Sequence, residues 1–287
     1  MQNFIDKLHE VMNTFKSMPP EQAAEAVSAP QRQDTVNAIS GDNIRFYGNT
    51  ELSDNYKNTL TDAIRFYQKE FNLTPHATIA RDPQWPTEEY GEGAQGVAYP
   101  FENAVTGQHD VVLKNLTAND EDKVKEMENF SESVGWAPKN AKGLSHVPVH
   151  ELGHILYDML VPKTEENEQA QIQSNKIYVD ALKDMGVADL TKPHTDKDRE
   201  KGMEEVKKIS GYAGSENGNM PNTDEGVAEA ISDYYYNRKD AATLSKAIVQ
   251  RLKNDSYTYG MRKAGEVSPY ASASTFMNNL RRYKVIQ

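Results

Sequence analysis

The sequence predicts an α+β fold, in which a region of short strands is followed by a region of helices. Short runs of β-branched and aromatic residues, bounded by turn residues, recur between residues 43 and 116. After residue 145, most segments place apolar residues at helical spacing. A helix, then strands that include an antiparallel pair, then mostly helices is the element order of an α+β domain.

In the globular part of the chain, a helix is expected at residues 53–71, with Ser53 as its N-cap. The expected strands are residues 43–48, 76–82, 96–102 and 109–116. The further expected helices are one beginning near Pro148 and those at residues 166–186, 196–209, 223–237, 241–252 and 272–286. No repeat is visible.

Two domains are expected: an N-terminal arm at residues 1–42 and a globular domain at residues 43–287. Residues 2–17 carry one apolar stripe, which predicts a short amphipathic helix. A polar segment broken by three prolines follows and is typical of a flexible tether. The helix could bind a protein partner, or it could fold back onto its own domain.

Composition limits the functional classes. The chain has 287 residues and no cysteine, which excludes disulfides and a thiolate metal site. Its net charge is −11 and its basic residues form no dense stripe, so nucleic acid is not an expected partner. No apolar run is long enough for a membrane span, and no signal peptide is recognisable. We therefore expect cytoplasmic synthesis, with localisation open: export by a non-classical route, or packaging in a virion.

The segment HELGH, residues 150–154, carries the strongest chemical signal. On a helix, His150 and His154 lie one turn apart on one face, so both imidazoles can reach one tetrahedral ion. Glu151 lies beside that ion and is suited to act as general base on the attacking water. The pattern predicts a zinc site. His146 precedes the expected helix start at Pro148, so we expect it in a loop near the rim.

A zinc site of this kind needs a third protein ligand. The candidates lie in residues 223–237, where Thr223 is expected to cap a helix. Glu225, Glu229 and Asp233 recur every four residues on one face of that helix. Three stacked carboxylates repel each other unless a cation or histidine N–H groups lie close by. The alternative interpretation is an acidic, solvated helix face.

HELGH followed by a distant ExxAE segment resembles the gluzincin metallopeptidases. The greatest similarity is to the group of the anthrax lethal factor catalytic domain and the Pro-Pro endopeptidases. The resemblance covers about residues 43 to 237 and implies a zincin-like domain, with a small mixed sheet, an edge strand and a helical C-terminal part. It also implies that Glu225 is the third zinc ligand, that Glu229 contacts the ligands but not the zinc, and that Tyr212 stabilises the oxyanion.

A second match leaves the third ligand open. The segment from Glu229 to Asp233 also resembles the third-ligand segment of thermolysin, in which case Glu229 binds zinc and Asp233 orients a histidine. The gap between Tyr212 and Glu225 is longer than in the first group, which makes Tyr212 the least supported assignment. Residues 109–116 are the expected edge strand, along which an extended polypeptide substrate would pair.

The expected function is that of a zinc-dependent endopeptidase that hydrolyses peptide bonds with metal-activated water. An alternative is a virion or secretion-system component, or a delivered toxin, that retains a zincin fold. The intact Glu151 favours the enzyme, because a retired site has little reason to keep its general base.

Overall fold

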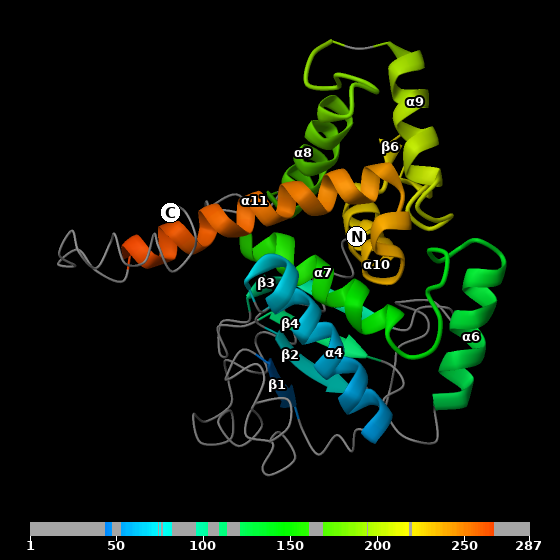
Figure 1. The fold of residues 1–287 in the computed structure, drawn as a ribbon, viewed down its shortest axis with the longest axis vertical. Helices are drawn as coiled ribbons and strands as arrows, with labels where there is room; N and C mark the ends of the chain where they lie inside the picture. The colour runs from blue at the N-terminus through cyan, green and yellow to red at the C-terminus, as the bar shows by residue number, and fades with distance from the viewer. Residues whose placement is uncertain are drawn as a thin grey trace, which may run out of the picture.

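The structure is a computed structural model that describes residues 44–47, 53–73, 75, 77–81, 96–102, 109–113, 121–160, 169–193, 195–217 and 220–266. Its helices are α4 (Asp54–Phe71), α6 (Glu121–Ser133), α7 (His146–Leu160), α8 (Gln169–Asp184), α9 (Asp196–Lys207), α10 (Thr223–Asn237) and α11 (Thr243–Glu266), with a 3₁₀ turn, η3 (Arg238–Asp240), before α11 (Figure 1).

Helix α7 lies at the centre of the core. It is apolar on most sides, and α4, α8, α10 and α11 all contact it. Its buried apolar side chains include Val149, Leu152, Ile155 and Leu156, each at most 1% exposed. Full burial of one such side chain contributes about 1.5–3 kcal/mol to folding. A helix that is apolar on most of its sides is stable only when those sides are packed, which explains why other helices surround α7.

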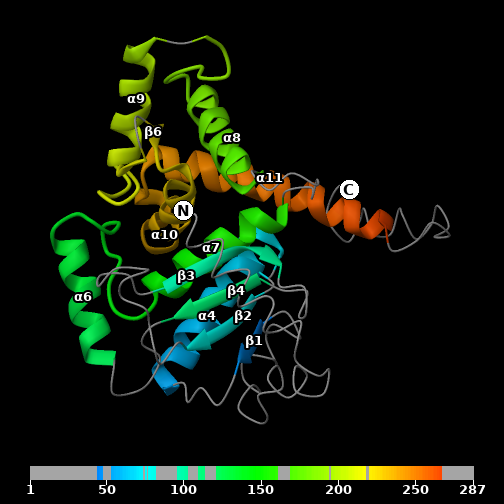
Figure 2. The same ribbon diagram turned by 180° about the vertical axis from the view of Figure 1, so that it is seen from behind.

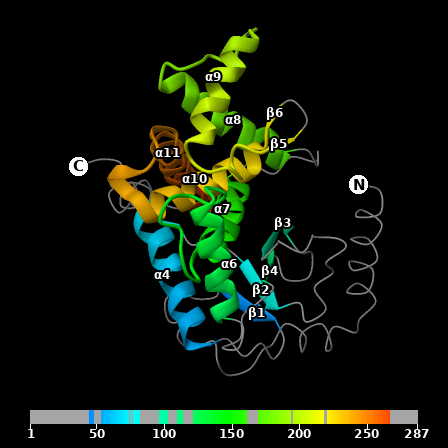
Figure 3. The same ribbon diagram turned by 90° about the vertical axis from the view of Figure 1, so that its right-hand side faces the viewer.

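The four strands β1 (Ile44–Tyr47), β2 (Ala77–Arg81), β3 (Gly96–Glu102) and β4 (His109–Leu113) are described mainly by their backbones. They pair in the order β1-β2-β4-β3, with only the β3–β4 pair antiparallel. Helices α4 and α7 lie on one side of these strands, as the views from behind and from the side show (Figures 2 and 3). A separate two-residue pair, β5 (Glu216–Asn217) and β6 (Met220–Pro221), precedes α10.

The predicted α+β class, a zincin-like domain built on a mixed sheet, is wrong for this chain. Among the residues whose side chains the structure describes, 72% are helical and 1% lie in strands, whereas the four paired strands are described mainly by their backbones. The reason lies in the packing. Among the described side chains, the buried hydrophobic cluster is formed by residues of the helices and their connections, and Ala98 of β3 packs against it. Helix α6 was also not expected, because its sequence is mostly charged.

The predicted edge strand is wrong as well. β4 pairs with β2 on one side and with β3 on the other, so it is an inner strand. Sequence patterns give no strand order, because order depends on pairing between segments distant in the chain. Within the described ladder, the outer strand in contact with α7 is β3.

The helix starts differ in part from expectation. Ser53 caps α4 as predicted, accepting a hydrogen bond from the backbone N–H of Tyr56 at 3.1 Å. Helix α10 begins at Thr223, but its N-cap is Asn222 and no side chain caps it. Helix α7 begins at His146, two residues before Pro148, so the prediction of His146 as a loop residue is wrong. A proline in the first helical turn needs no N–H partner, which permits this earlier start.

Residues 1–42, with the expected N-terminal helix and tether, and the expected helix at 272–286 lie outside the described residues. None of the helices that the structure describes has an apolar stretch long enough to cross a membrane.

Gly153 sets how closely α7 approaches α10. A Cβ atom at this position would lie 3.3 Å from Ile231 Cδ1, 3.4 Å from Ala228 Cα and 3.4 Å from the Tyr67 hydroxyl. We expect Gly153→Val to lower the free energy of unfolding by about 1–3 kcal/mol, the usual cost of overpacking a core. Gly153→Ala should cost less, because a methyl group needs only small shifts. Denaturant unfolding of both variants checks this order, and a Val variant as stable as wild type would contradict it.

Candidate metal centre

Helices α7 and α10 pack against each other and bring three ligand-type side chains to one point. The Nε2 atoms of His150 and His154 lie 3.1 Å apart. The Oε2 atom of Glu225 lies 2.9 Å from Nε2 of His150 and 3.4 Å from Nε2 of His154. The two histidines meet because their four-residue spacing puts them on one helix face. Glu225 joins them because the first turn of α10 lies over that face.

These three donors could hold a metal ion. Zn–N and Zn–O bonds of about 2.0–2.1 Å in a tetrahedron place ligand atoms roughly 3.3 Å apart. The three observed separations surround that value. Two imidazoles and one carboxylate form a usual ligand set for a catalytic zinc, which leaves one position for water or substrate.

The other ring nitrogen of each histidine is occupied. Nδ1 of His150 lies 2.8 Å from Oε1 of Glu229, and Nδ1 of His154 lies 2.8 Å from the hydroxyl oxygen of Tyr157. When Nδ1–H donates to these acceptors, the lone pair of Nε2 is free to point at the shared centre. Such outer partners fix the tautomer and the ring orientation of metal-binding histidines.

The charges of the cluster favour a cation. Burial alone would raise the pKa of Glu225, but attraction by His154 and hydrogen bonds from His150 and His154 hold it well below its usual range. Burial would lower the pKa of His150, yet hydrogen bonds to Glu225 and Glu229 raise it well above its usual value. The carboxylates therefore stabilise positive charge between α7 and α10.

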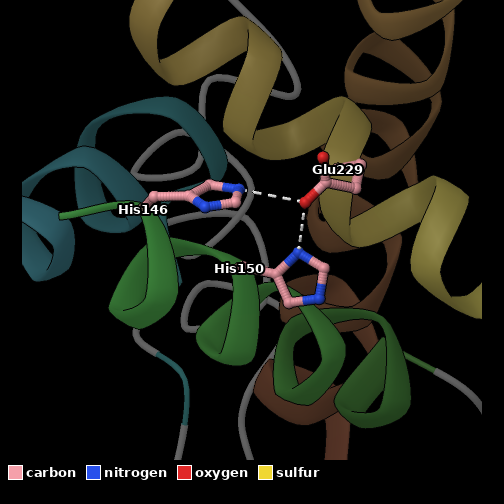
Figure 4. A group of neighbouring side chains, drawn as sticks. All are labelled: His146, His150 and Glu229. Atoms are coloured by element: carbon pink, nitrogen blue, oxygen red, sulfur yellow. Dashed lines mark hydrogen bonds and ion pairs between the residues drawn. The ribbon is translucent and has the colours of Figure 1, made fainter. Parts of the chain in front are cut away.

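A second group shares His150 and could also hold a metal ion: His146, His150 and Glu229. Oε1 of Glu229 lies between the two rings, 3.0 Å from Nε2 of His146 and 2.8 Å from Nδ1 of His150 (Figure 4). Oε2 of Glu229 accepts a hydrogen bond from Ser210 at 2.7 Å. Burial alone would raise the pKa of Glu229, but His146 and His150 outweigh it and lower that pKa to about 2.

The first group is the more open of the two. The Glu225 side chain is 21% exposed and that of His154 is 13% exposed, whereas that of Glu229 is fully buried. Substrate or water can approach a metal only at an accessible ligand set. In the second group, both carboxylate oxygens of Glu229 already accept hydrogen bonds, Oε1 from the two rings and Oε2 from Ser210. We therefore interpret the second group as hydrogen-bonded residues that hold His150 in place for the first group.

Tyr212 lies against the cluster. Its ring stacks on that of His150, with centroids 5.9 Å apart. Burial raises the pKa of its hydroxyl well above the usual range, and the nearby carboxylates of Glu225 and Glu151 raise it further. The turn that carries Tyr212 is fixed by backbone hydrogen bonds from Gly211 to Gly135 (2.7 Å) and from Tyr212 to Trp136 (3.0 Å). Tyr212 thus remains protonated and able to donate.

Glu151 lies beside the same centre, buried on α7. Burial raises the pKa of its carboxyl group, and His150 and His154 oppose that rise. The backbone of β3 passes next to it: a Cβ atom on Gly96 would lie 2.8 Å from both Cγ and Oε1 of Glu151. Only glycine permits this close approach without a shift.

Asp233 does not join the site. Its carboxylate accepts hydrogen bonds from the Asn237 side chain at 2.7 Å and from the Ala242 backbone N–H at 2.8 Å. Glu229 lies at Nδ1 of His150, and no hydrogen bond joins Asp233 to a histidine among the described residues, so the geometry favours Glu225 over Glu229 as the third ligand. Asp233 instead ties the end of α10 to the start of α11.

Sequence reasoning missed three members of the site. His146 and Glu128 lie 2.7 Å apart, and Ser210 holds Glu229. The signal for His146 was its position four residues before His150, which places it on the same helix face once the helix starts early enough. Glu128 and Ser210 gave no signal, because their partners are distant in the sequence.

No known protein family, no curated protein and no solved structure matches this chain.

Proposed function

We propose that this protein is a zinc-dependent peptidase of the gluzincin type. One observation carries the proposal: Nε2 of His150, Nε2 of His154 and Oε2 of Glu225 converge within 3.4 Å of each other, and a further buried carboxylate, Glu151, lies on the same helix. This is the donor set and the general base that metal-assisted hydrolysis requires. His150, His154 and Glu225 would hold the ion.

A zinc ion bound there supplies a Lewis acid for the substrate carbonyl and for water. Glu151 would take the proton of the attacking water and later give it to the leaving amine. Burial raises the pKa of Glu151 toward the operating pH, where a carboxyl group can both take up and release a proton. The Tyr212 hydroxyl would donate a hydrogen bond to the oxyanion as charge develops on it.

A polypeptide is the substrate class that the surroundings favour. β3 is the outermost strand at its end of the described ladder and passes beside Glu151. An extended peptide pairs with such a strand through backbone hydrogen bonds. This pairing would hold the scissile bond next to the general base.

The experiment that tests the proposal is zinc content by mass spectrometry, together with cleavage of a peptide library by the same preparation. We expect one zinc per chain and cleavage that a chelator abolishes and added zinc restores. A preparation that holds zinc and cleaves no member of the library would overturn the peptidase function. Cleavage that survives complete zinc removal would overturn the role of the metal.

Gly96 offers a separate test of the strand beside Glu151. We expect Gly96→Ala to lower peptide cleavage by up to about 10²-fold, since displacing a catalytic group by about 1 Å costs that much. The new methyl group would collide with Glu151 and with Val147 Cγ1, also 2.8 Å away. Zinc content should not change, because no ligand moves directly. Equal cleavage rates for variant and wild type would show that β3 does not confine Glu151.

A further inference from the structure

We infer that His146 is a positioning residue of the metal centre, which holds Glu229 where that carboxylate fixes the ring of His150. The inference deepens the proposed function and rests on it for the zinc that His150 would bind. The geometry is a continuous chain of side chains from three helices: Glu128 on α6, His146 on α7, Glu229 on α10 and His150 on α7.

The contacts of this chain are all of hydrogen-bond length. Nδ1 of His146 lies 2.7 Å from Oε2 of Glu128, and Nε2 of His146 lies 3.0 Å from Oε1 of Glu229. The same Oε1 atom lies 2.8 Å from Nδ1 of His150. One oxygen of Glu229 thus accepts hydrogen bonds from both imidazole rings (Figure 4).

Burial makes this arrangement necessary. Glu229 is fully buried and Glu128 is 4% exposed. A buried carboxylate is costly unless it is paired and hydrogen-bonded. Ionised carboxylates only accept hydrogen bonds, so a ring between two of them donates from both nitrogens and carries a positive charge. His146 therefore offsets the charge of both carboxylates.

His150 alone cannot offset the charge of Glu229, because its Nε2 atom faces Glu225 and the metal position. Without His146, Glu229 keeps Ser210 and His150 as its donors among the described residues, and we expect its carboxylate to be held less firmly toward His150. His150 would then lose the acceptor that selects its tautomer. His154 has a different partner, Tyr157, so the effect should be confined to His150.

The competing interpretation is a second metal ion bound by His146, His150 and Glu229. That ion would have to displace the hydrogen bonds at Oε1 of Glu229. The number of zinc ions per chain separates the two interpretations.

The test uses the full chain and three variants. His146→Phe removes both donors, His146→Gln keeps one donor for Glu229, and Glu128→Gln keeps the shape of the outer carboxylate without its charge. Glu132→Gln is the matched control. Glu132 lies on α6 one turn further on, and its carboxylate interacts with the Asn140 backbone N–H (3.0 Å) and with Lys142 (3.6 Å), away from His146 and Glu229.

Two properties are measured. The first is the zinc dissociation constant, by competition with a chromogenic chelator. We expect zinc to bind about 10–100-fold more weakly to His146→Phe, the usual effect of losing an outer partner, with smaller losses for His146→Gln and Glu128→Gln and none for Glu132→Gln. The second is the hydrogen bond between Nδ1–H of His150 and Glu229 in the metal-free chain, followed by ¹⁵N-edited NMR of the His150 ring. The signal of a proton on Nδ1 should be lost in His146→Phe.

Unchanged zinc affinity and an unchanged Nδ1–H signal of His150 in the folded variants would overturn the inference. Two zinc ions per wild-type chain and one per His146→Phe chain would overturn it in favour of the second metal site. If His146→Phe does not fold, His146→Gln and Glu128→Gln carry the same comparison. If the wild-type chain cleaves no peptide, zinc affinity and the NMR signal of His150 can still be measured. If it binds no zinc, the NMR signal alone tests whether His146 positions Glu229. Failure of the proposed function is therefore distinguishable.

Discussion

Replacing Glu151 by glutamine is expected to lower peptide hydrolysis by about 10²–10⁴-fold, the contribution of a positioned general acid–base. The amide has the size of the carboxylate but cannot take a proton from water. Because Glu151 is buried on α7 next to Gly96, a residue of equal size should leave the packing undisturbed. Initial rates on a cleaved library peptide measure the effect.

The comparison needs zinc content and stability from the same preparations. Glu151→Gln should hold as much zinc as wild type, since Glu151 is not among the three converging donors. Glu151→Asp should retain part of the activity, because it keeps a carboxylate at a longer distance from the centre. Full activity in Glu151→Gln would remove Glu151 from the mechanism, and loss of zinc would show that it acts as a ligand.

Replacing Glu225 by glutamine should abolish zinc stabilisation of the fold at moderate zinc concentrations. A ligand at 100 times its dissociation constant stabilises the folded chain by about 2.7 kcal/mol. Glu225 supplies the only carboxylate oxygen within 3.4 Å of Nε2 of both His150 and His154 among the described residues. Its loss should therefore weaken zinc binding by more than the roughly 10–100-fold expected for an outer partner.

Glu229→Gln is the matched variant, one helical turn along α10. It should weaken zinc binding less than Glu225→Gln does, since Glu229 faces Nδ1 of His150. Thermal unfolding with and without zinc, for both variants, gives the order. If Glu229→Gln loses more zinc than Glu225→Gln, the third ligand is Glu229, and the assignment drawn from the geometry is wrong.

The local features of the site could be predicted from the sequence. The four-residue spacing of His150 and His154 places both rings on one face of any helix, and the apolar residues around them require that helix to be buried. Ser53 as a helix cap is local in the same sense. These predictions involve contacts within one or two turns, where the backbone geometry is known in advance.

The mixed sheet as the basis of the fold was wrongly predicted, although short strands do occur. Apolar alternation shows that a segment prefers extended backbone, but it does not show what covers it. Most of the described core is made by helices, because the apolar sides of α7 pack against α4, α8, α10 and α11. The inner position of β4 likewise depends on pairing between distant segments.

By itself, the sequence determined that two imidazoles share one helix face with a carboxylate next to them, and that an acidic helix follows downstream. Only the tertiary structure decided which glutamate of α10 meets Nε2 of His150, because that depends on where α10 crosses α7. It also brought His146 to Glu229, because the helix starts early, and it placed Glu128 of α6 at hydrogen-bond distance from the His146 ring. Such contacts join residues far apart in the chain, so spacing within one segment carries no information about them.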